Sequence, residues 1–228
     1  MSAPLSLSNA SGRTEHSGSR ILRLPAPSHL LVPLCPPVRV QIQGVRNDQI
    51  HPHPRPGGRK TAVLRLLESK GAAVVEEAAT DVIALERAGG HREPWRDQCF
   101  IGKNVALQRQ RQARAQATEA AAIFFDRSPV CTLALSRYLG FAPSRLLEDE
   151  VERVVGDNVY ESTVFFLRHQ GSIQATEARQ ISFEDSLDFE QLHRQTYRDL
   201  GFKLAEVPAV PLADRVALIQ KTVERLHW

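Results

Sequence analysis

Cysteine is scarce in this sequence, and its distribution limits the possible roles of the thiols. Cys35, Cys99 and Cys131 lie far apart and are odd in number. This pattern fits free thiols in a reducing compartment better than a disulfide framework. His51 and His53 follow Cys35, but they lack the paired CxxC or HxxxH spacing of zinc sites. We therefore interpret them as solvated histidines of a proline-rich loop.

Aromatic residues, long apolar runs and an excess of one charge are also missing. Aromatic side chains make up 6% of the 228 residues, and the formal net charge is +3 without a long Lys/Arg run. This composition argues against nucleic acid as a partner. No run of about 18 apolar residues exists, so the sequence predicts no transmembrane segment.

Residues 108–114 are dense in Gln and Arg, a pattern typical of a nucleic-acid-binding helix. We favour another interpretation of this segment. It would belong to a long helix over residues 94–121 that packs Phe100, Val105 and Leu107 inward. Such a helix exposes its charged face to solvent.

Acidic residues are nearly absent from the first 37 positions, where Glu15 is the only one. This segment is rich in Ser, Pro and Arg, a composition typical of a disordered tail or of an organellar transit peptide. Prolines from Pro25 onward disfavour the amphipathic helix of a transit peptide. We expect a disordered extension over 1–37 and a cytoplasmic protein, with organellar targeting as the alternative.

A glycine pair stands before Lys60 and Thr61, at the start of an amphipathic segment. Gly57 and Gly58 in this position indicate a phosphate-binding loop, in which backbone N–H groups and the lysine contact phosphates and the Thr hydroxyl holds Mg²⁺. Taken alone, the loop fits a chance Gly-rich turn before a helix equally well. Residues 38–44 alternate apolar and polar side chains and end on Gly44, as the first strand of a nucleotide-binding sheet does.

The loop departs from the strict GxxxxGK[ST] pattern. Arg59 stands where that pattern has its second glycine, and its Cβ would obstruct close approach of the backbone to phosphate. If Gly44 is the first loop glycine, residues 45–55 form an insert. Either this copy has lost nucleotide turnover or the insert is a gene-model error, and the sequence leaves both open.

The remaining chain alternates short apolar runs with amphipathic segments. This pattern predicts one α/β domain over 38–228 with a mostly parallel sheet. Ser144 is the expected N-cap of a helix whose acidic residues 148–150 face solvent. The expected strands are 38–44, 72–75, 122–125, 158–167 with 163–167 as its apolar core, and 202–208. The other expected helices are 60–69, 78–88, 132–139, 183–200 and 212–226.

Charged residues follow two of these strands, where a parallel sheet places its ligand crevice. Asp126 at the end of a buried strand is a candidate Mg²⁺ ligand, directly or through water, and Arg127 is a candidate phosphate-neutralising group. Glu77 is a candidate for acceptor binding or base work; a solvated glutamate at a helix start fits it equally well. The long polar segment 168–182 contains Arg168 and Arg179, which we expect in a lid over phosphates.

Several of these stretches resemble a known family. The chain is similar to predicted P-loop ATPases with an AAA-labelled domain, which are related to the nicotinamide-riboside kinase part of a bacterial NAD regulator and distantly to thymidylate and deoxynucleoside kinases. The stretches are Gly44 with residues 56–61, residues 74–79, 95–97, 125–127, 139–140, 197–202, 206–208 and 215–216.

The resemblance implies a P-loop NTPase fold, a three-layer αβα sandwich that binds ATP or GTP with Mg²⁺. Lys60 and Thr61 look like the phosphate lysine and the Mg²⁺ ligand, and Asp126 looks like the Walker B or catalytic carboxylate. Arg127 looks like the phosphate-binding arginine of the kinase relatives, and Glu77 would lie at the site of a small-molecule acceptor. The alternative is a catalytically degenerate module that binds nucleotide, proteins or phosphoinositides through a damaged loop.

Overall fold

The structure is a computed structural model that describes residues 38–44, 59–168 and 183–226. All of these residues belong to one compact unit, Pro36–Trp228. The expected insert 45–55, the lid residues 169–182, and the candidates Gly57, Gly58 and Arg179 lie outside the described residues.

The centre of the domain is a five-stranded sheet in the order β2-β3-β1-β4-β5. Every pair of neighbouring strands is parallel, so the mostly parallel sheet expected from the sequence is parallel throughout the described residues. All residues of β4 are buried, as its uninterrupted apolar run predicts. The strands are β1 Val38–Gly44, β2 Ala73–Val75, β3 Ala122–Asp126, β4 Thr163–Leu167 and β5 Lys203–Val207.

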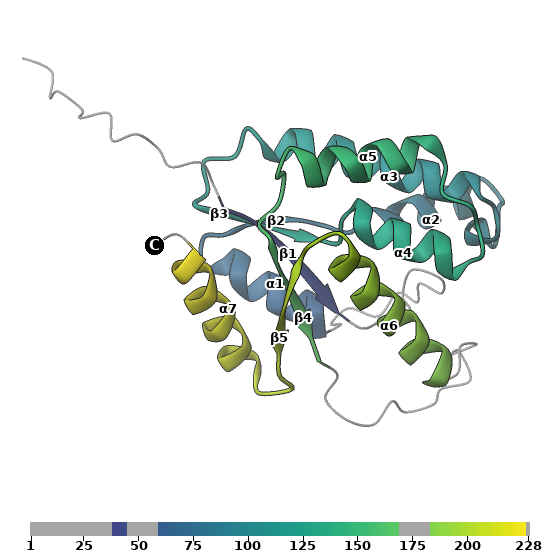
Figure 1. Ribbon diagram of the computed structural model, residues 1–228. Helices are drawn as coiled ribbons and strands as arrows, with labels where there is room; N and C mark the ends of the chain where they lie inside the picture. Colours follow the sequence, from purple (N-terminus) through teal and green to yellow (C-terminus); the bar gives the residue numbers. More distant parts are fainter. Residues whose placement is uncertain (1–37, 45–58, 169–182, 227–228) are drawn as a thin grey trace, which may run out of the picture. The chain divides into compact units, whose positions relative to one another are not determined.

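Helices cover both faces of this sheet and form the expected three-layer sandwich (Figure 1). One face packs against α1 and α7. The other packs against α3, α4, α5 and α6, and α2 joins these helices farther from the sheet. The helices are α1 Arg59–Ser69, α2 Ala78–Ala88, α3 Cys99–Ala115, α4 Pro129–Tyr138, α5 Arg145–Gly156, α6 Phe183–Asp199 and α7 Leu212–Leu226.

The two faces of β1 differ in polarity. Val40 and Ile42 are buried in the apolar cluster formed with α1 and α7. Gln41 and Gln43 point to the opposite face, because successive side chains of a strand alternate, and they are also buried. The alternation that predicts a strand here therefore does not mark a solvent-exposed face. It marks a polar patch inside the protein.

The single long helix expected over residues 94–121 is wrong. The chain forms a 3-10 turn, Pro94–Arg96, before α3, and α3 ends at Ala115. The Asp97 carboxylate accepts the backbone N–H of Cys99 at 2.8 Å and starts α3 there, a local bond that competes with a continuous helix. As expected, Phe100 and Val105 are buried and Leu107 packs on the same cluster.

The acidic run at 148–150 is not wholly exposed, which corrects the sequence-based expectation. Glu150 is only 2% exposed, and its two oxygens accept hydrogen bonds from Arg153 at 2.9 and 2.6 Å. Arg153 also donates to Gln112 on α3 at 2.6 Å. The ion pair with Arg153 offsets the energetic cost of burying the Glu150 carboxylate. The N-cap prediction is confirmed, because the Ser144 hydroxyl accepts the N–H of Leu147 at 3.4 Å.

Candidate nucleotide site

Lys60 and Asp126 form an ion pair at the carboxyl edge of the sheet. Lys60 lies in the first turn of α1, which follows β1 in the chain, and Asp126 is the last residue of β3. The register of the sheet pairs Asp126 with Ile42, near the end of β1. Each side chain is 11% exposed. The parallel arrangement thus brings together two residues that are distant in the sequence.

Arg127 and Glu77 form a second ion pair at the same edge. The Nε atom of Arg127 lies 2.7 Å from Oε1 of Glu77, and the side chains are 2% and 13% exposed. Glu77 is the N-cap residue of α2 and follows β2, the neighbour of β3. The backbone of Arg127 has φ 76°, in the left-handed region that costs a non-glycine residue about 1 kcal/mol. This conformation turns the chain between β3 and α4.

The four charges of this edge influence one another because they are removed from water. Burial raises the pKa of Asp126; Lys60 opposes this shift, Glu77 adds to it and Arg127 opposes it. Two cations and two anions balance within the cluster. A phosphate that contacts Lys60 or Arg127 therefore competes with the carboxylate that each cation already contacts.

The other candidate residues occupy separate positions. Thr61 is exposed in the first turn of α1, and Gly44 ends β1. Arg168 follows β4, and its Nε donates to Glu206 on β5 at 3.2 Å. The role of Arg168 in a lid stays a prediction.

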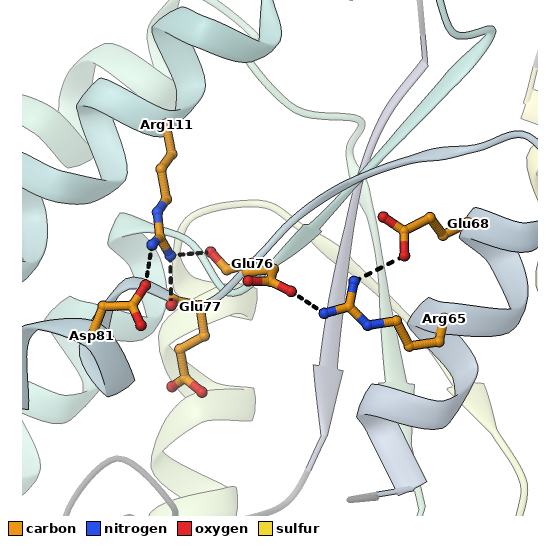
Figure 2. Close-up of polar contacts among 6 residues, drawn as sticks. All are labelled: Arg65, Glu68, Glu76, Glu77, Asp81 and Arg111. Atoms are coloured by element: carbon orange, nitrogen blue, oxygen red, sulfur yellow. Dashed lines mark hydrogen bonds and ion pairs between the residues drawn. The ribbon is translucent and has the colours of Figure 1, made fainter. Parts of the chain in front are cut away.

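A half-buried arginine of α3 holds the turn between β2 and α2, as Figure 2 shows. Arg111 donates from Nη1 to the carbonyl oxygens of Glu76 at 2.9 Å and of Glu77 at 2.6 Å. Its Nη2 binds the Asp81 carboxylate. The carboxylate of Glu77 points away from Arg111 in this view. Arg111 thus fixes the backbone of Glu77 and leaves the side chain to Arg127.

We expect Arg111→Ala to lower the free energy of unfolding by about 2 kcal/mol, because two carbonyls and one carboxylate lose a charged donor. The matched control is Arg65→Ala. Arg65 contacts only side chains in the described part of the chain, Glu68 and Glu76, and is 53% exposed. Urea unfolding of both variants checks this prediction. Equal losses of stability in the two variants would show that the hydrogen bonds of Arg111 to the two carbonyl oxygens do not stabilise the fold.

Sequence reasoning missed His193 of α6 and gave Tyr197, the first residue of the family-like stretch 197–202, no role of its own. His193 is 5% exposed, and its Nδ1 lies 2.9 Å from the carbonyl oxygen of Phe189. Burial, with the charge of Arg127 next in importance, lowers the pKa of His193 to about 3. Tyr197 is fully buried. Phe189, His193 and Tyr197 recur every four residues, the spacing of one helical face, and this spacing was the available signal.

The parallel sheet, the lysine at the start of α1 and the carboxylate at the end of β3 define the class of P-loop α/β domains. A family model described as "AAA domain" matches residues 56–215. The match spans more than half of the chain, and the chain belongs to this P-loop family.

Two solved structures resemble the chain at low sequence identity. Thymidylate kinase from Ehrlichia chaffeensis is 12% identical, with a TM-score of 0.46 over 82% of this chain and 98% of that one. Thymidylate kinase from Candida albicans is 12% identical, with a TM-score of 0.48 over 84% of this chain and 92% of that one. No curated protein matches the chain significantly. In the described part of the chain, no helix is long and apolar enough to cross a membrane.

Proposed function

We propose that this protein binds ATP or GTP with Mg²⁺ and acts as an NTPase or small-molecule kinase. The observation that carries the proposal is the ion pair between Lys60 and Asp126 at the carboxyl edge of the sheet. Membership of the AAA domain family supports it independently.

The residues divide the work of phosphoryl transfer by position. Lys60 would leave Asp126 for the oxygens of the β- and γ-phosphates, assisted by N–H groups of the first turn of α1. Arg127 would neutralise charge on the transferred group. Its present partner Glu77 would then be available to orient the attacking hydroxyl or water. Catalysis by such a site consists mainly of positioning and charge neutralisation.

The donors near Lys60 fit magnesium. Mg²⁺ in nucleotide sites is held by one or two protein oxygens together with phosphates and water. Asp126 offers a carboxylate and Thr61 a hydroxyl, and the described residues contain no cluster of three His, Cys, Asp or Glu that would form an all-protein metal site. Mg²⁺ bound there would supply positive charge to the phosphates.

Equilibrium dialysis with labelled ATP and GTP tests the proposal. We expect Mg²⁺-dependent binding of at least one nucleotide, weakened roughly 10- to 150-fold by Lys60→Ala, because a charge-assisted contact contributes about 1.5–3 kcal/mol. Lys70→Ala is the matched control, an exposed lysine just beyond the other end of α1.

The same experiment separates a catalytic protein from a degenerate one. One outcome is that the unmodified protein binds nucleotide but releases no ADP or GDP. If Arg59→Gly together with deletion of residues 45–55 then creates this release, the loop is damaged and the scaffold is intact. Absence of any Lys60-dependent binding would overturn the proposal.

A further inference from the structure

The inward face of α6 reaches the charged edge of the sheet. α6 connects the parallel strands β4 and β5, so it runs antiparallel to them and begins near their carboxyl ends. Tyr197 on this helix contacts Gln43 near the end of β1. His193 lies one helical turn before Tyr197, closer to that edge. The charges of Arg127, Lys60 and Glu77 all act on its imidazole, which agrees with this placement.

The hydrogen bond of the His193 ring defines which nitrogen carries the proton. The Phe189 carbonyl oxygen is only an acceptor, so Nδ1–H donates to it at 2.9 Å. In the neutral ring, Nε2 then has a lone pair and no hydrogen. This atom is buried and has no hydrogen-bond partner among the residues that the structure describes. A buried acceptor without a partner is costly in a folded protein.

A second buried acceptor lies on the same side of the sheet. The Gln43 side chain donates from Nε2 to the Tyr197 hydroxyl at 2.8 Å. Its Oε1 is buried and finds no hydrogen-bond partner in the described ranges 38–44, 59–168 and 183–226. Gln43 is the last residue of β1 before Gly44. Two acceptors without a partner in the described residues thus lie on the α6-covered side of the sheet, one near the end of β1 and one on α6 itself.

We propose that His193 Nε2 and Gln43 Oε1 accept hydrogen bonds from the O–H or N–H groups of an uncharged acceptor substrate. This inference rests on the proposed function in one respect, since the ligand is taken to receive the phosphoryl group. It specifies the substrate class: a neutral hydroxyl or amino compound, not a molecule that already carries a phosphate at this point.

The reason is that both available atoms, His193 Nε2 and Gln43 Oε1, are hydrogen-bond acceptors. A phosphate presents only acceptor oxygens when ionised, and it would meet two acceptor atoms at His193 and Gln43. Burial, together with the charges of Arg127 and Lys60, lowers the pKa of His193, so the ring does not become a cation that binds phosphate. A hydroxyl or amino group satisfies both atoms without changing any charge.

The test is NMR of the full chain with ¹⁵N-labelled histidine, with His193 assigned from its variants. The probes are matched pairs: the four ribonucleosides, glucose and glycerol, and their respective phosphate esters. We expect a bare Nε2 in the free protein and a shift of its resonance toward the hydrogen-bonded range with at least one neutral compound. The phosphate ester of that compound should have no such effect.

Two substitutions separate ligand binding from folding. His193→Leu removes the acceptor atom and should weaken the responding probe about tenfold, the value of one hydrogen bond. Its melting temperature should equal or exceed that of the unmodified protein, because a buried atom without a partner is lost. His193→Gln places an acceptor oxygen near the same position and should retain binding within a few-fold.

Each contrary result overturns the inference. These results are a protonated ring or an Nε2–H tautomer at neutral pH, a response confined to phosphate esters, equal binding by His193→Leu, and no response to any probe. Binding of Mg²⁺ and ATP is measured in parallel on the same samples. If ATP binds and no neutral probe responds, this inference fails alone; if Lys60-dependent ATP binding is absent, the proposed function fails whatever His193 shows.

Discussion

Replacing Glu77 with glutamine is expected to lower the free energy of unfolding by about 3 kcal/mol, because removal of one member of a buried ion pair leaves an uncompensated charge. The Arg127 side chain is 2% exposed and lies 2.7 Å from the Glu77 carboxylate. Glutamine keeps the shape and one acceptor oxygen but removes the negative charge. Urea denaturation of both proteins measures the difference.

Glu76→Gln is the matched control. Glu76 is the preceding residue, and its side chain is 56% exposed and pairs with Arg65, so its loss should change stability little. Combining Glu77→Gln with Arg127→Met should recover most of the lost stability, because the buried charge then disappears with its partner. A Glu77→Gln protein as stable as the Glu76→Gln protein would contradict the buried pair.

Replacing Tyr197 with phenylalanine is expected to lower the free energy of unfolding by about the same amount as Glu77→Gln. The hydroxyl donates to Gln41 Oε1, accepts from Gln43 Nε2 and bonds the Ser128 hydroxyl, each at 2.8 Å. Phenylalanine fills the same space and leaves these buried groups without that partner. At about 1–3 kcal/mol for each unsatisfied group, and with partial relaxation, we expect a loss of about 3 kcal/mol.

Tyr160→Phe provides the comparison within the same chain. The Tyr160 hydroxyl is also buried, but Gln112 is its hydrogen-bond partner in the described residues, at 2.5 Å. We expect a loss of about 1 kcal/mol for that single bond. Thermal and urea unfolding of the two variants, measured together, check the ratio. A smaller loss of stability for Tyr197→Phe than for Tyr160→Phe would show that the hydrogen bonds of the Tyr197 hydroxyl do not stabilise the fold.

Local patterns in the sequence predict most of the elements of this fold. The bounds of β1, α2 and α7 agree with the predicted ranges, since strand alternation and helical periodicity are visible within a few residues. The strand predicted over 158–167 is shorter, because β4 covers only its apolar core, Thr163–Leu167. The break between residues 96 and 99 escaped prediction because it depends on one side-chain bond of Asp97. The periodicity of an amphipathic helix carries no information about such a bond.

The site was less predictable than the fold, for a different reason. Strand-end position indicated Asp126, Arg127 and Glu77, because the carboxyl edge of a parallel sheet follows from topology. Burial of a polar residue depends on partners from distant parts of the chain. Glu150 therefore has no sequence signature of its own, and the signal for His193 was limited to its helical spacing from Phe189 and Tyr197. The packing of α5 and α6 shows that both side chains are inside.

The central position of β1 has a consequence for the order of folding during synthesis. β1 pairs with β3 and β4, and neither is its neighbour in the chain. Its polar groups cannot find all of their partners until residues up to Leu167 have left the ribosome, on the order of ten seconds later at about 5–20 residues per second. Until then, the edge of β1 that pairs with β4 stays open, and non-local pairing of this kind is slow. The nascent chain is thus most vulnerable to aggregation before β4 emerges.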